Sequence, residues 1–136
     1  MDLTLKYPPT AEFAPRLANL AIAAAKDISH IELDFSAESL DALEEIIERF
    51  CADGLSVNDI GSTLFCFGCY LGEVLTRNLG GNWVETSASP MASYAQWPMV
   101  VKMDNGDWWN PIGKLFKRFT EGAGESLPYF YSLAAG

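Results

Sequence analysis

Cysteine, histidine and basic residues are all scarce in this chain, and each scarcity excludes a class of protein. Three cysteines, an odd number, do not form the paired framework of a small secreted protein, so we expect a reducing, cytoplasmic compartment. The single histidine, His30, is the only residue around which a serine or cysteine triad would be built. We expect it at the surface or at a boundary, without a catalytic role. No apolar run approaches the roughly 20 residues that span a bilayer.

The nine basic residues are outnumbered by 18 acidic ones, and the resulting net charge of −9 is concentrated in one half of the chain. Residues 1–76 hold 4 Lys or Arg and 13 Asp or Glu, whereas residues 77–136 hold 5 of each kind. Such a field repels phosphate backbones and anionic lipid headgroups, so we expect neither nucleic acid nor a membrane as partner. It attracts a basic protein surface. The alternative, that the acidity only maintains solubility, stays open.

Cys66 and Cys69 have the C-x-x-C spacing of redox and zinc sites, but their sequence context argues against both chemistries. A redox pair needs its thiolate at a helix N-terminus, whereas these cysteines fall two turns inside an apolar helix. Zinc would need two further ligands, and only Cys51 and His30 remain, without paired spacing. We therefore predict buried structural cysteines, no metal site and no cofactor.

The length and the hydrophobic content of 49% suit one packed domain that spans residues 1–136. Apolar residues at three- and four-residue spacing predict helices over about 10–27, 37–52 and 60–79. Polar residues in front of these segments predict helix caps at Thr10, Ser36 and Asp59.

Alternating polar and apolar residues predict strands over 82–86 and 99–103. The same pattern over residues 31–35 indicates either a short strand or an extended connection. Asn105-Gly106 predicts a tight hairpin that leads into Trp108 and Trp109, and Asn110-Pro111 starts a helix that ends at Gly122. The expected fold class is α+β, with N-terminal helices packed on a small, mostly antiparallel sheet and a short C-terminal helix.

The third predicted helix is apolar on nearly all sides, so we expect it to be the central buried element. Its interior glycines share one face, which predicts a neighbour packed very close to the backbone. Glu73 is the only acid from Leu64 to Leu75, and Arg77 follows four residues later, so we expect a salt bridge at the edge of the core. The functional alternative is a ligand pocket with Glu73 as its polar group, flanked by Trp83 and Trp108.

The second predicted helix separates its apolar and acidic residues onto opposite faces. At 100° per residue the acidic side collects four carboxylates: Glu38, Asp41, Glu45 and Glu48. No Lys or Arg is interleaved before Arg49, and like charges at helical neighbours are destabilising. We therefore predict that these four residues bind a basic partner, the alternative being an ordinary solvated face.

Four segments resemble a family of small, uncharacterised bacterial domains. They are Leu33–Ser36 with Ser39-Leu40, Gly68–Leu75, Gly80–Trp83 and Asn110–Lys114. The shared motifs are structural: a capped helix, a glycine-bearing buried helix, a Trp strand and a Pro-started helix. The resemblance implies no assigned activity. In size, acidity and α+β layout the chain is also similar to bacterial immunity proteins, which neutralise toxins.

These observations favour a non-enzymatic protein–protein interaction domain, such as an immunity protein that covers a basic toxin surface. The competing hypothesis is a small-molecule binder or enzyme, with its pocket between the glycine face of the third helix and the tryptophan strands. A third hypothesis, a structural subunit of an assembly, predicts an exposed apolar patch instead of an acidic one.

Overall fold

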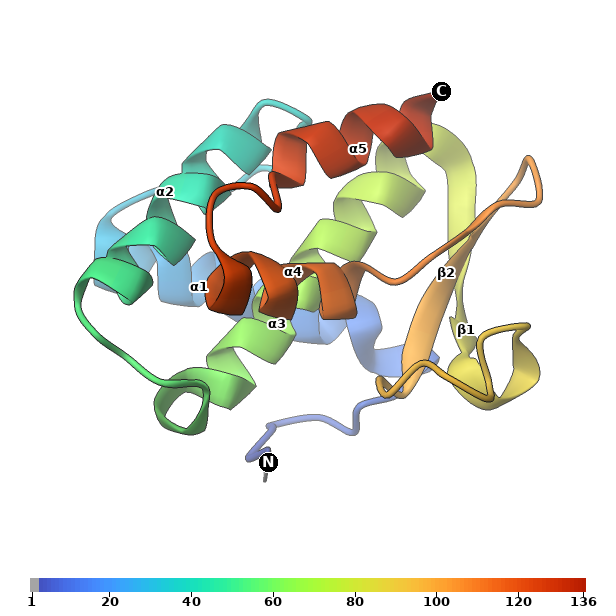
Figure 1. The fold of residues 1–136 in the computed structure, drawn as a ribbon, viewed down its shortest axis with the longest axis horizontal. Coiled ribbons are helices and arrows are strands. Elements are labelled where there is room, and N and C mark those ends of the chain that lie inside the picture. The colour runs from blue at the N-terminus through green and yellow to red at the C-terminus, as the bar shows by residue number, and fades with distance from the viewer. Residues whose placement is uncertain (1–2) are drawn as a thin grey trace.

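A computed structural model describes residues 3–136, which fold into five α-helices and a three-stranded antiparallel sheet (Figure 1). The helices are α1 (Ala14–Ser29), α2 (Ser39–Ala52), α3 (Val57–Leu75), α4 (Pro111–Glu121) and α5 (Leu127–Ala135). The strands, in the order β1-β2-β3, are β1 (Gly81–Glu85), β2 (Met99–Met103) and β3 (Trp108–Trp109). The predicted α+β class is confirmed, including the short C-terminal helix.

Helix α3 is the centre of the molecule, as its composition predicted. Every residue from Leu64 to Leu75 is buried, because α1 and α4 pack against different sides of the helix. Four of the five buried residues of α1 are alanines, and their small side chains let α1 and α3 approach closely. Within residues 3–136 no helix is long and apolar enough to cross a membrane.

Three helix starts differ from the sequence predictions. Helix α2 begins at Ser39, two residues after the predicted position, with Glu38 and not Ser36 at its N-cap. A 3₁₀ turn, Ala11–Phe13, precedes α1, and the side chain of Thr10 makes no capping bond.

Helix α3 begins three residues before the predicted position, because Ser56 and Asp59 cap it together. The Ser56 hydroxyl accepts a bond from the backbone N–H of Asp59, and the Asp59 carboxylate accepts one from the backbone N–H of Ser56. The predicted cap is therefore the second half of a capping box.

Residues 31–35 form an extended connection and not a strand, which was one of the two alternatives that the pattern allowed. Phe35 has a left-handed backbone, with φ of +66°, so the chain turns sharply there. Its N–H donates to the Tyr70 hydroxyl at 2.8 Å, and its carbonyl accepts from Asn78 Nδ2 at 2.8 Å. These bonds to side chains replace the backbone partners of a strand.

The sheet has two distinct faces, which its register defines. Val101 of β2 is paired with Trp83 of β1 and with Trp109 of β3, so these three side chains share one face. Lys102 is paired with Asn82 and Trp108, which share the opposite face because side chains alternate along a strand. The tryptophans of β1 and β3 are thus divided between two surfaces.

The glycines of α3 mark the closest contacts of the core, as predicted. A Cβ atom at Gly68 would lie 2.8 Å from the Cα atom of Ile112 in α4. A Cβ atom at Gly72 would overlap the Trp83 ring and would lie 3.0 Å from Pro111 Cγ. The absence of these side chains therefore lets β1 and α4 reach the backbone of α3.

Gly72→Ala is expected to lower the free energy of unfolding by about 1–3 kcal/mol, since the added methyl group forces the Trp83 ring out of its position. Gly124→Ala is the matched control, because no atom lies within 4 Å of a Cβ at that position. Its expected effect is below about 1 kcal/mol. Urea unfolding of the two variants measures the difference, and equal stabilities would contradict the close packing at Gly72.

Candidate functional site

Helix α2 turns its apolar residues into the core and its acidic residues outward. The buried side chains are Leu40, Leu43, Ile46, Ile47 and Phe50. The four carboxylates predicted to bind a partner, Glu38, Asp41, Glu45 and Glu48, are all exposed, and they are called the acidic face below. The predicted separation of the two sides is therefore present in the structure.

The acidic face is largely uncompensated by cations of the chain itself. Within the described part of the chain, no ion pair involves Glu38, Asp41 or Glu45. Glu48 alone has a partner: its Oε2 accepts a bond from Arg118 Nη2 at 2.8 Å, and its side chain remains 60% exposed. Three of the four negative charges thus face solvent without an internal counter-charge.

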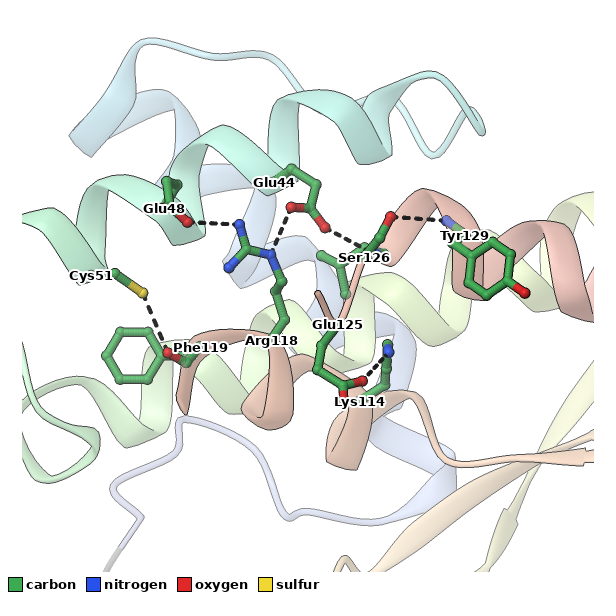
Figure 2. Close-up of polar contacts among 10 residues, drawn as sticks. Glu44, Glu48, Cys51, Lys114, Arg118, Phe119, Glu125, Ser126 and Tyr129 are labelled. Carbon is green, nitrogen blue, oxygen red and sulfur yellow. Dashed lines mark hydrogen bonds and ion pairs between the residues drawn. The ribbon is translucent and has the colours of Figure 1, made fainter. Parts of the chain in front are cut away.

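Arg118 of α4 binds two carboxylates of α2 at the edge of the acidic face (Figure 2). Its side chain is 2% exposed, and its Nε donates to Glu44 Oε2 at 2.7 Å. The other oxygen of Glu44 accepts from the backbone N–H of Leu127, the first residue of α5. Since one guanidinium serves both Glu44 and Glu48, this cluster still has one negative charge in excess.

The protonation of Arg118 follows from these contacts. Burial alone would lower the pKa of the guanidinium, but its hydrogen bonds to Glu48 and Glu44 outweigh burial and raise the pKa. Arg118 therefore stays charged. Sequence reasoning missed both Arg118 and Glu44, because the two residues are 74 positions apart and no local pattern connects them.

Glu73 has the salt bridge that its spacing predicted. Its Oε1 accepts from Arg77 Nε at 3.1 Å, and its Oε2 accepts from Trp83 Nε1 at 2.9 Å. The Glu73 side chain is 7% exposed. Both carboxylate oxygens are therefore engaged by the protein, so the group is held as a structural ion pair.

The pocket predicted beside Glu73, Trp83 and Trp108 is not formed by these three residues. The Trp83 ring fills the space against Gly72, where the cavity was expected. Trp108 lies on the opposite face of the sheet from Trp83, with Lys102 Nζ 5.6 Å from its ring centroid. The register of the strands places Trp83 and Trp108 on opposite faces of the sheet, and the sequence pattern does not specify that register.

The two cysteines with C-x-x-C spacing lie inside the core, as predicted. Cys66 and Cys69 are buried, and burial raises the pKa of the Cys66 thiol to about 11 and that of Cys69 well above its usual range. Among residues 3–136 no group of three or more His, Cys, Asp or Glu side chains is placed to hold a metal ion. His30 is exposed and ends α1 with a left-handed backbone, φ +55°.

The segments that carry the family resemblance meet around α3. The Phe35 ring stacks on Tyr70 with centroids 5.0 Å apart, and Arg77 lies 3.7 Å above its centroid. Trp83 packs against Gly72, and Asn110 caps α4 by accepting from the N–H of Gly113. These contacts give each motif a structural role.

Comparison with known proteins adds no relative. No family model matches the chain, and no curated protein or solved structure is significantly similar to it.

Arg118→Met is expected to lower the free energy of unfolding by about 2 kcal/mol. The change leaves Glu44 beside the core without its cation. Because Glu44 and Glu48 are both partly exposed, the loss of stability is expected to be smaller than for a fully buried ion pair. Arg49→Met is the matched control, because Arg49 is exposed on α2 and its loss is expected to cost less than about 0.5 kcal/mol. Thermal and urea unfolding measure both effects, and an equal loss in the two variants would count against the anchoring role of Arg118.

Proposed function

We propose that the chain is a non-enzymatic protein-binding domain whose acidic face receives a basic surface of another protein. The observation that carries this proposal is the exposure of Glu38, Asp41 and Glu45, none of which forms an ion pair with another residue of the described range 3–136. Together with Glu48 these carboxylates extend along about 15 Å of one helix, at a rise of about 1.5 Å per residue.

The arrangement costs the free protein some stability. Carboxylates three or four residues apart on a helix repel one another, by roughly 0.2–0.5 kcal/mol for each pair. Asp41 has Glu38 and Glu45 as neighbours at these spacings, and Glu45 has Glu48. Lys or Arg side chains of a partner would remove this repulsion on binding.

The acidic face is also held rigidly, which favours recognition. The opposite side of α2 is buried in the core, and Arg118 fixes the helix to α4 while Glu44 fixes it to α5. A helix backbone that is fixed before binding loses little conformational freedom when a partner docks. Complementary charge further accelerates encounter and sets the register of the complex.

Apolar anchors for such a complex lie on α5, the helix joined to α2 through Glu44. Tyr129 is 61% exposed and Leu133, one turn later, is 49% exposed. Tyrosine is enriched among the residues that dominate binding energy at interfaces. We expect these side chains to contribute affinity beside the electrostatic contact.

An immunity protein is the kind of binding domain that the size and acidity of the chain resemble. In that role the partner is a toxin with a basic functional surface, and the acidic face covers it. The expected result is stoichiometric inhibition of the toxin by the folded chain, without turnover of a substrate.

The test reverses two charges of the acidic face with Asp41→Lys and Glu45→Lys in one variant. Both side chains are exposed and free of ion pairs within residues 3–136, so the fold is expected to remain intact. Glu48 is left unchanged because a lysine there would face Arg118. The tagged wild-type chain captures its partner from cells, and association rates with that purified protein are then measured at about 50 and 300 mM salt. We expect a loss of at least about tenfold in the association rate at low salt.

The matched control reverses two exposed acids elsewhere, Glu12→Lys and Asp107→Lys, and so changes the net charge equally. This control is expected to bind at close to the wild-type rate. Equal slowing in both variants would mean that the net charge of the chain, and not the acidic face, sets the association rate. Binding of the Asp41→Lys/Glu45→Lys variant at the wild-type rate would rule out the acidic face as the interface.

A further inference from the structure

A cleft of about 490 Å³ opens between the segment that precedes β2 and helix α4, apart from the acidic face. This volume falls within the range of small-molecule sites. The segment contributes Tyr94 to Trp97, and the other wall comes from α4 together with Glu125 and Phe130. The cleft thus joins residues that are well separated in the sequence.

Aromatic rings form the walls of the cleft. Trp97 stacks on Phe116 with centroids 4.3 Å apart and an interplanar angle of 27°, and both residues line the cleft. Phe130 lies deeper, 8% exposed, and Tyr94 stands at the rim with 68% of its surface exposed. Stacking against such rings favours a planar ligand.

Two lysines of α4 give the cleft a charge opposite to that of the chain as a whole. Lys114 donates to Glu125 and lies 5.9 Å from the Phe130 ring centroid. Lys117, one turn later, is exposed and makes no ion pair with any residue that the structure describes. With Glu125 balanced by Lys114, the cleft keeps one positive charge in a chain of net charge −9.

We infer that this cleft binds a small planar aromatic carboxylate, with the ring against Trp97 and Tyr94 and the carboxylate at Lys117. The charge complementarity selects the anion, and the stacked rings select the aromatic body. Two lysines are too few to hold a nucleic acid on so acidic a chain. The volume of the cleft, about 490 Å³, suits a single small molecule. This site is separate from the acidic face and does not depend on the proposed protein-binding function.

Equilibrium dialysis of the full chain against 1-naphthoate and its neutral analogue 1-naphthalenemethanol tests the inference. We expect one naphthoate per chain, bound more tightly than the alcohol. Lys117→Gln is expected to weaken naphthoate binding about fivefold and to leave the alcohol unchanged, since only the anion meets the lysine. Tyr94→Ala, an exposed change that leaves the core intact, is expected to weaken both probes.

Lys6→Gln is the matched control, because this exposed lysine lines a second, smaller cavity of about 220 Å³. It is expected to change the binding of neither probe. The inference is overturned if the two probes bind equally well, if Lys117→Gln has no effect on naphthoate, or if Lys6→Gln weakens naphthoate as much as Lys117→Gln does. The absence of saturable naphthoate binding at millimolar concentration would overturn it as well.

Discussion

The burial of α3 on all sides is the constraint from which the rest of the structure follows. A helix that is apolar all around must be covered by other elements, and here α1, α4 and the Trp83 ring cover it. The glycines at positions 68 and 72 let two of these neighbours reach its backbone. The same close packing fills the space where a pocket beside Glu73 was expected, so burial of the helix and loss of that pocket have one cause.

Helix α2 is attached to this core by one face only, which leaves its acidic face to solvent. Arg118 pairs with both Glu44 and Glu48 at the edge of the helix, and among residues 3–136 no ion pair involves Glu38, Asp41 or Glu45. The guanidinium therefore strengthens the attachment of α2 while the outer surface stays negative. A rigid helix with unrelieved charge is poorly explained by folding alone, because neutral polar residues would avoid the repulsion. Docking of a basic protein, as proposed above, would relieve that repulsion.

Features that depend on local sequence were predictable, whereas those that depend on distant contacts were not. The approximate positions of the helices, the Asn105-Gly106 hairpin, the Asn110 cap and the Glu73–Arg77 pair all rest on neighbours within a few positions. The extended path at Phe35 depends on Tyr70 and Asn78, and the face of Trp108 depends on strand register. The acidic face itself was predicted, but its anchor was not, because Arg118 belongs to another helix.

Carbodiimide coupling of glycine ethyl ester to carboxylates, read by mass spectrometry, tests the uncompensated acidic face most directly. In the free chain the account predicts fast labelling of Glu38, Asp41 and Glu45, slower labelling of Glu44, and the slowest labelling of the buried Glu73. In the complex with the captured partner, labelling of the first three is predicted to fall while that of Glu12 stays unchanged. Slow labelling of these three carboxylates in the free chain, or undiminished labelling in the complex, would contradict the account.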